Sequence, residues 1–178
     1  MGVEYIDLYL LHWPRLVPFQ ETLDALLSLR TAGKIRDFGV SIFDSKNRYR
    51  WLELIGRAES ATNRILYNFS RRGVEWDVLP LCRNFNLPIM AYSPLEQGRL
   101  QNETVLSRVA KRHDVQPLQI ALAWVLAQKN VITIPKAVCH QHIDQNIAAT
   151  EIILDREDHA ILDRAFPPPS KPSPLEML

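Results

Sequence analysis

The stretch Tyr5-Ile6-Asp7-Leu8-Tyr9-Leu10-Leu11-His12-Trp13-Pro14 decides the fold. Its apolar and aromatic residues predict a buried strand over 5–12, which carries His12 and Trp13 at its C-terminal tip. In folds built from parallel strands and helices, the chemistry takes place at these tips. Only four residues precede the stretch, so we expect the chain to begin in the middle of an enzyme.

Outward from this stretch, short apolar runs alternate with longer helical patterns. Gly33 predicts a helix end, and Asp44 and Pro117 predict helix starts. Further strands are expected over 35–41, 65–68, 87–93 and 131–135, and helices over 22–29, 49–55, 76–82, 104–111, 117–128, 142–149 and 156–166.

Strands that alternate with helices indicate parallel pairing through right-handed crossovers. The strands are almost continuously apolar, which is typical of a sheet covered on both faces. No repeat or linker divides the sequence, so we expect an α/β fold and one domain over 1–178. Residues 166–178 are expected to form an irregular, proline-rich tail.

Composition narrows the class of protein further. The 21 Lys and Arg residues nearly balance the 20 Asp and Glu residues, which predicts neither a nucleic-acid partner nor a membrane surface. Cys82 and Cys139 lie far apart without CxxC spacing, as expected of reduced thiols. No apolar run approaches the roughly 20 residues of a membrane helix, and the N-terminus lacks signal-peptide features. These observations predict a soluble, cytoplasmic protein.

Four motifs occur in an order and spacing that match a known family. They are 2–14, which ends in His12-Trp13-Pro14, then 33–41, Tyr92-Ser93-Pro94-Leu95 and Ile134-Pro135-Lys136. The chain resembles the aldo-keto reductases over essentially its whole length, from the fourth strand of their (β/α)8 barrel to the C-terminus. The resemblance implies a partial TIM barrel of five parallel βα units plus a C-terminal helix. It also implies NADPH-dependent reduction of carbonyl compounds by hydride transfer.

The resemblance assigns one catalytic residue to this chain. The family uses a tetrad of Asp, Tyr, Lys and His, and His12 matches the His, which orients the carbonyl and assists proton transfer. Trp13 matches a residue of the substrate pocket. The simpler interpretation of His12 is hydrogen bonding at a strand end, but the Trp13-Pro14 that follows favours the functional one. The tuned Tyr acid comes from the first three strands, so we expect the chain alone to have little or no activity.

The resemblance places most contacts to NADPH in this chain. Tyr92 matches the ring that stacks on the nicotinamide, and Lys136, before a helix start, matches the cation that binds the 2′-phosphate. Ser93, Leu95, Gln97 and Gly98 match the loop around the pyrophosphate. The remaining cofactor-binding residues implied by the resemblance are Ser41, His142, Gln145 and Asn146.

Three positions depart from the family pattern. Ile42 replaces an Asn that hydrogen-bonds the nicotinamide carboxamide. Arg64 replaces a Gln that shares this carboxamide, and Arg offers donors but no acceptor. His142 replaces an Arg at the adenosine phosphate and is mostly neutral at pH 7, so Lys136 is expected to carry most of the preference for NADPH.

A second hypothesis is a non-catalytic module, a truncated half barrel that binds nucleotide or serves in assembly. Five strands cannot close an eight-stranded barrel, so inward residues such as Leu8, Val40 and Ile134 are expected to meet water. Self-association, or addition of an N-terminal half, would bury them. No metal site is predicted, and His113 is expected at a solvated helix end.

Overall fold

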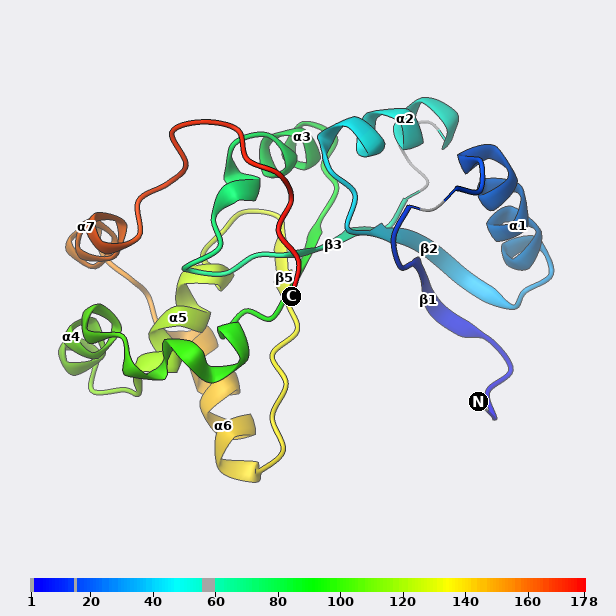
Figure 1. The fold of residues 1–178 in the computed structure, drawn as a ribbon. Coiled ribbons are helices and arrows are strands. Elements are labelled where there is room, and N and C mark those ends of the chain that lie inside the picture. Colours follow the sequence, from blue (N-terminus) through cyan, green and yellow to red (C-terminus); the bar gives the residue numbers. More distant parts are fainter. Residues whose placement is uncertain (1, 15, 56–59) are drawn as a thin grey trace.

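The computed structural model describes residues 2–14, 16–55 and 60–178, and in them it contains one five-stranded parallel sheet (Figure 1). Neighbouring strands in the sheet are also neighbours in sequence, so the helices act as crossovers between them. The strands are β1 (Ile6–Leu11), β2 (Ile35–Ser41), β3 (Asn63–Leu66), β4 (Ile89–Tyr92) and β5 (Val131–Thr133).

All five predicted strands are present, and the largest difference concerns β3, which begins two residues before the predicted 65–68. The Asn63 side chain explains the earlier start. Its Nδ2 donates to the Phe43 carbonyl at 2.8 Å, and its Oδ1 accepts from the Phe43 amide at 3.4 Å, which fixes Asn63 beside the end of β2. Asn68, predicted to end this strand, instead lies in the turn that follows β3.

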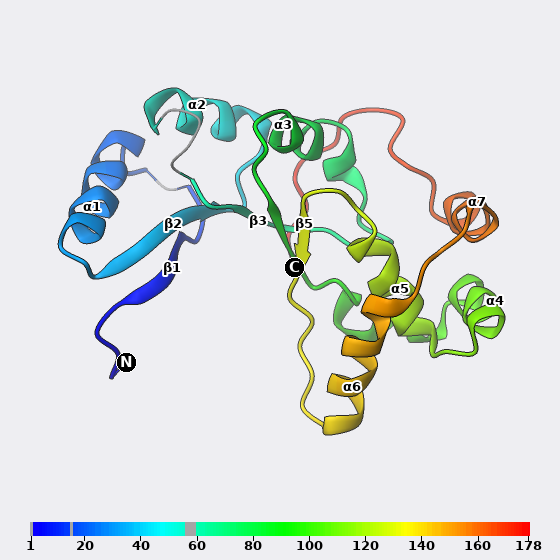
Figure 2. The ribbon, with the colours of Figure 1, turned by 180° about the vertical axis from the view of Figure 1, so that it is seen from behind.

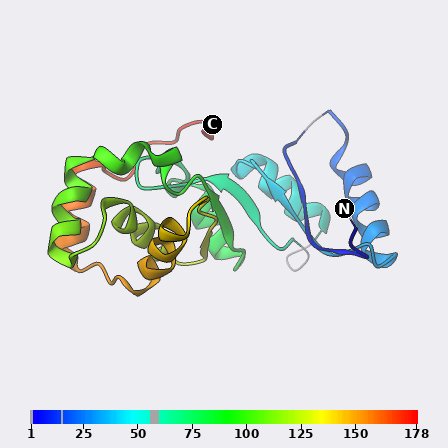
Figure 3. The same cartoon turned by 90° about the horizontal axis from the view of Figure 1, so that it is seen from below.

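Six of the seven α-helices in the described residues fall into two groups along the sheet, and α3 lies between them (Figure 1). Figures 1 and 3 show α1 and α2 beside β1 and β2, and α4 to α7 at the other end of the molecule. The α-helices are α1 (Phe19–Thr31), α2 (Ser45–Ile55), α3 (Val78–Asn84), α4 (Thr104–His113), α5 (Pro117–Leu126), α6 (His140–Ala148) and α7 (Arg156–Ala165). The 3₁₀ helices in the described residues, which were not predicted from the sequence, are η1 (Gly73–Glu75), η2 (Glu96–Asn102) and η3 (Ala149–Glu151).

The predicted helix signals are confirmed. Gly33 follows α1 with a φ of +67°, a conformation that favours glycine. The Asp44 carboxylate accepts a hydrogen bond from the Asn47 amide at 2.7 Å, as an N-terminal cap does. Pro117 occupies the first turn of α5, where its missing N–H costs nothing.

Two apolar clusters pack against the sheet. The smaller joins α1 and α2 to β2, with Trp51 edge-on to Phe38 at a centroid distance of 6.4 Å. Val40 belongs to this cluster and is fully buried, so the expectation that it faces inward and meets water is wrong. Ile134 is 39% exposed, as expected, and Leu8 is half-buried. The larger cluster packs α3, α4, α5 and α7 around β3 and β4.

His113 is only partly exposed and has a buried partner, which corrects the expectation from its charged neighbours. Its Nε2 lies 2.7 Å from Oδ2 of Asp158, which is fully buried. Arg112 Nε lies 3.0 Å from the other oxygen of the same carboxylate. Asp158 also accepts from the Asp155 amide in the capping box of α7, so one carboxylate fastens α4 to α7.

The tail after α7 has no helix or strand, as predicted. Figure 2, seen from behind, shows it passing α3 on its way to the middle of the molecule. There Arg71 Nη1 donates to Glu176 at 3.1 Å. None of the helices in the described part of the chain has the length and apolar character needed to cross a membrane.

Candidate functional site

A cavity of about 890 Å³ lies at the C-terminal ends of β4 and β5. This volume falls within the range of small-molecule and cofactor sites. The described residues that line it are Arg64, Tyr92, Ser93, Pro94, Leu95, Gln97, Gly98, Gln101, Gln116, Leu118, Gln119, Ile134, Pro135, Lys136, Gln141, His142, Gln145 and Asn146.

The charge of this cavity has one sign. Arg64 and Lys136 are cationic, and none of the described lining residues is an Asp or a Glu. Most of the remaining polar side chains are amides, which offer both donors and acceptors. Lys136 is exposed and lies three residues after the end of β5. The arrangement suits an elongated ligand that carries negative charge and polar edges.

The cavity brings together nine of the residues predicted from the sequence. These are Tyr92, Ser93, Leu95, Gln97, Gly98, Lys136, His142, Gln145 and Asn146. Ser41 is not among the lining residues: it is 1% exposed, and its hydroxyl donates to the Arg64 carbonyl at 3.1 Å.

His12 and Trp13 lie at a second, smaller hollow of about 220 Å³. Their rings stack with centroids 4.2 Å apart, and both residues follow β1, as predicted from the sequence. Val17, Phe19 and Thr22 complete its described lining with Leu11. Because β1 and β5 are opposite edges of the sheet, the two hollows belong to opposite ends of the strand order.

Arg64 and Tyr92 face one another inside the large cavity. Leu66 is the register partner of Tyr92, so Arg64 and Tyr92 project from the same face of neighbouring strands. The Arg64 guanidinium carbon lies 4.7 Å from the centre of the Tyr92 ring, within range of a cation–π interaction. A flat ligand that stacks on this ring face must therefore displace or share it with Arg64.

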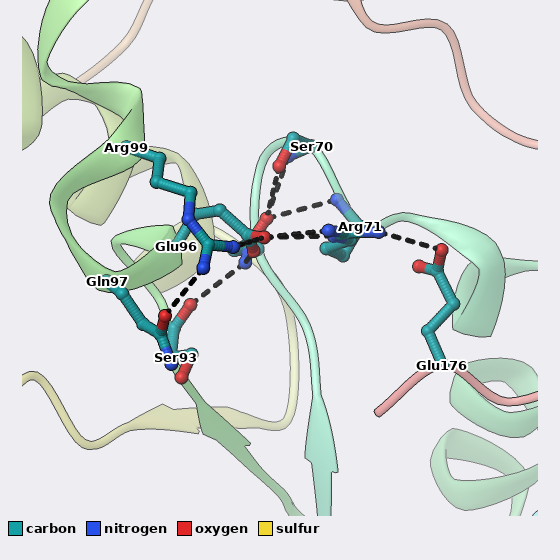
Figure 4. Close-up of polar contacts among 8 residues, drawn as sticks. Ser70, Arg71, Ser93, Glu96, Gln97, Arg99 and Glu176 are labelled. Atoms are coloured by element: carbon teal, nitrogen blue, oxygen red, sulfur yellow. Dashed lines mark hydrogen bonds and ion pairs between the residues drawn. The ribbon is translucent and has the colours of Figure 1, made fainter. Parts of the chain in front are cut away.

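The loop between β4 and η2 forms one wall of the cavity, and it is held by a buried carboxylate (Figure 4). Glu96 is 4% exposed and accepts hydrogen bonds from Arg71 and Asn68. Burial by itself raises the pKa of Glu96, but these hydrogen bonds outweigh it and hold the pKa below the ordinary value. Glu96 is therefore ionised at neutral pH.

The sequence analysis did not find the amide groups contributed by α5. Gln119 Nε2 donates to the Gln145 carbonyl at 3.1 Å, so α5 supports the helix α6 across the cavity. Gln116 and Gln119 also form a capping box. The signal was present in the Gln-Pro-x-Gln spacing of 116–119, which is a capping pattern at a helix start.

Comparison with known proteins identifies relatives of the whole chain. The family model described as "Aldo/keto reductase family" matches residues 1–166. The match begins at residue 1 and does not bear out the narrower expectation that the chain is the C-terminal part of such a protein. Methylglyoxal reductase YeaE of Escherichia coli is 40% identical, and the alignment covers 100% of this chain and 64% of that protein. Glyoxal reductase of Bacillus subtilis is 34% identical over 92% of this chain and 58% of that protein.

A solved structure has nearly the same fold as the described chain. The aldo/keto reductase from Klebsiella pneumoniae in complex with NADP and acetate has a TM-score of 0.95 and 40% sequence identity. The superposition covers 98% of this chain and 64% of the Klebsiella chain. The present chain thus spans slightly less than two thirds of the length of these relatives.

Proposed function

The chain belongs to the aldo/keto reductase family, and on this basis we propose that it acts in NADPH-dependent carbonyl reduction with the large cavity as its dinucleotide site. The observation that carries the proposal is the Lys136 cation in a cavity that has no carboxylate among its described lining residues. NADPH carries a pyrophosphate and a 2′-phosphate, and such groups are bound by cations and polar donors. The Klebsiella relative was crystallised with NADP.

Under this proposal, the parts of NADPH are assigned to the lining residues as the resemblance implies. Lys136, with His142, would hold the 2′-phosphate, and the Ser93, Leu95, Gln97 and Gly98 loop would hold the pyrophosphate. Gln145 and Asn146 would contact the adenine. Tyr92 would lie against the nicotinamide, and Ser41, which the resemblance also assigns to the cofactor, is buried beside Arg64. A Cβ added at Gly98 would have nothing within 4 Å, so the loop leaves open space for a ligand there.

NADPH, when bound, supplies the hydride. This chain contributes His12, which would orient the carbonyl oxygen, and Trp13, which would bound the substrate. The resemblance assigns the Tyr, Lys and Asp of the tetrad to strands that precede the fourth in the family barrel. We therefore propose that the five strands form an arc of such a barrel, in one domain. A polypeptide of these 178 residues alone would then reduce carbonyls weakly.

The substrate is a small carbonyl compound under this proposal. Two relatives are named for methylglyoxal and glyoxal reduction, and the small hollow beside His12 suits molecules of this size. A steady-state assay with NADPH and methylglyoxal tests it. Without the tuned acid the rate should fall by at least the 10²–10⁴ typical of general acid catalysis. Turnover near one per second that disappears in His12→Ala would contradict weak activity of the chain alone.

A non-catalytic module that binds nucleotide or assembles with a partner is the second candidate function. The contact between Arg64 and the Tyr92 ring favours it, because this contact covers the face on which nicotinamide would stack. In that case the adenosine end of a dinucleotide would still bind, and the nicotinamide end would stay loose. Binding without turnover, in the chain and in any assembly that completes the sheet, would identify this function.

The cofactor proposal is tested by comparing NADPH with NADH. Lys136→Ala should erase most of the preference for NADPH, because a charge-assisted hydrogen bond contributes roughly 1.5–3 kcal/mol, or about 10- to 100-fold in affinity. Fluorescence titration of both nucleotides measures the dissociation constants. Lys129→Ala, which removes another exposed lysine outside the cavity lining, is the control and should preserve the preference. Equal affinities in the parent chain would refute the proposed role of Lys136.

A further inference from the structure

The cavity loop adopts a backbone that its sequence does not favour. Ser93, Glu96 and Gln97 have φ values of 49°, 47° and 55°, and Gly98 follows with a φ of 84°. For residues other than glycine, this left-handed region is higher in free energy. They adopt it only where contacts with the rest of the protein stabilise it. Such strain is common where backbone is shaped to receive a ligand. The question is which contacts hold this loop.

The Glu96 carboxylate supplies these contacts. Its Oε2 accepts from Asn68 Nδ2 at 2.7 Å, and its Oε1 accepts from Arg71 Nε at 3.1 Å and Nη2 at 2.9 Å. The same Asn68 amide donates to the Ser93 carbonyl at 2.9 Å. The loop is thus fastened at its first residue and at its middle to one turn after β3 (Figure 4).

This turn is itself ordered by the other end of the Asn68 side chain. Asn68 Oδ1 accepts from the Ser70 amide at 2.9 Å and from the Arg71 amide at 3.0 Å. These bonds set the backbone of Arg71, whose guanidinium then reaches Glu96. The ordered turn therefore sets the positions of the Asn68 amide and of the Arg71 backbone, the two points from which Glu96 is held.

Three charged groups face Glu96 or its partner. Arg71 comes from the turn after β3, and Arg99 of η2 lies 3.5 Å from Glu96 Oε1. Glu176 of the C-terminal tail lies 3.1 Å from Arg71 Nη1. The Arg71 guanidinium thus contacts two carboxylates, that of Glu96 inside the fold and that of Glu176 in the tail.

We propose that Glu96 is a positioning residue whose carboxylate holds the loop Ser93–Gly98 in its ligand-binding shape, and that Arg71 couples this shape to the C-terminal tail through Glu176. The identity of the ligand as NADPH rests on the proposed function. The shape of the loop does not, because the contacts that set it lie within the chain.

The test compares Glu96→Gln with the parent by amide hydrogen exchange and by NADPH titration. The Gln side chain turns an NH₂ toward the donors of Asn68 or Arg71, so one hydrogen bond must be lost. Exchange of the amides within 93–98 should become at least tenfold faster, and the dissociation constant for NADPH should rise at least tenfold. Glu103→Gln, seven residues along the chain, is the control and should change neither.

The coupling to the tail has its own variant. Glu176→Gln should accelerate exchange in the loop less than Glu96→Gln but more than the control, because Arg71 keeps its two bonds to Glu96. Loop exchange equal to that of the control would overturn the coupling.

Acidification tests Glu96 without any substitution. Because the folded-state pKa of Glu96 lies below its ordinary value, loop protection should be constant from neutral pH down to about 5. It should fall only as the pH drops further, through the folded-state pKa. Exchange is first corrected for its intrinsic pH dependence. If the Glu96→Gln variant does not fold, this acid step in the parent still decides the proposal, and its absence would overturn it.

The hydrogen-exchange and NADPH-titration measurements test the role of Glu96 and the identity of the cofactor separately. A parent chain that does not bind NADPH contradicts the cofactor, while the exchange arm still measures the role of Glu96. Unchanged loop exchange in a folded Glu96→Gln variant would overturn the role of Glu96, whatever the affinity for NADPH.

Discussion

At the scale of single residues, the contact between Arg64 and the Tyr92 ring decides how the nicotinamide end of a dinucleotide can bind. Two sequence motifs, 92–95 and 134–136, identify the aromatic ring of Tyr92 and the cation of Lys136. The family resemblance also implies that Arg64 replaces a carboxamide acceptor. That its guanidinium stands over the Tyr92 ring depends on the pairing of β3 with β4, which only the structure gives.

Arg64→Gln should tighten the binding of NADPH. The substitution removes a cation–π contact of about 0.5–2 kcal/mol that nicotinamide must displace, and it adds an acceptor for the carboxamide. The expected gain is roughly twofold to thirtyfold. Fluorescence titration with NADPH measures it, and adenosine 2′,5′-bisphosphate, which lacks the nicotinamide, should bind unchanged.

Arg36→Gln is the matched control, since Arg36 is exposed on β2 in an ion pair with Asp7 and does not line the cavity. Weaker binding of NADPH by Arg64→Gln would mean that the guanidinium contacts the cofactor favourably. The interpretation that Arg64 covers the ring face of Tyr92 against nicotinamide would then be wrong.

At the scale of elements, hydrophobic pattern was sufficient to place every strand of the described sheet within two residues. The hydrophobic pattern did not show which face of the sheet each side chain occupies. β2 is buried along most of its length, so buried and exposed residues do not alternate along it. This is why Val40 was placed on the wrong face. Nor could charge at a helix end reveal that His113 meets a buried carboxylate, since that carboxylate lies 45 residues away along the chain.

Asp158→Asn should destabilise the packing of α4 on α7. The fully buried carboxylate contacts Arg112 and His113 and caps α7. An amide cannot satisfy all of these groups, and an unsatisfied buried polar group costs about 1–3 kcal/mol. Urea unfolding followed by circular dichroism measures the free energy of unfolding.

Glu157→Gln provides the comparison for this prediction, because Glu157 pairs with Arg112 at the surface, where ion pairs contribute little. Equal free energies of unfolding for Asp158→Asn and Glu157→Gln would show that the buried carboxylate does not fasten the two helices.

At the scale of the whole molecule, the sheet has two edges with apolar side chains. β1 pairs with β2 alone and β5 with β4 alone among the described strands. Tyr9 on β1 is 44% exposed and Ile132 on β5 is 49% exposed. Unpaired strand edges of this kind favour association with another chain. These edges could be predicted from the strand count, whereas the shape of the cavity could not, because it depends on how β3, β4, η2, α5 and α6 pack.

The chain should therefore associate as its concentration rises. Sedimentation over a concentration series measures the association, and Ile132→Lys should weaken it, because a charge on an edge strand opposes pairing. Ile153→Lys, at a position that is 85% exposed outside the strands, is the control. One monomeric species at every concentration, with cooperative unfolding and no binding of a hydrophobic dye, would contradict the exposed-edge account.

The central claim is that the cavity at the ends of β4 and β5 holds NADPH. Amide chemical shifts of the chain during titration with NADPH test it most directly. The account predicts saturable changes concentrated in residues 92–98 and 134–146, with none in α1, which lies at the other end of the sheet. Changes that never saturate, or that appear in α1 and not in these two segments, would contradict it.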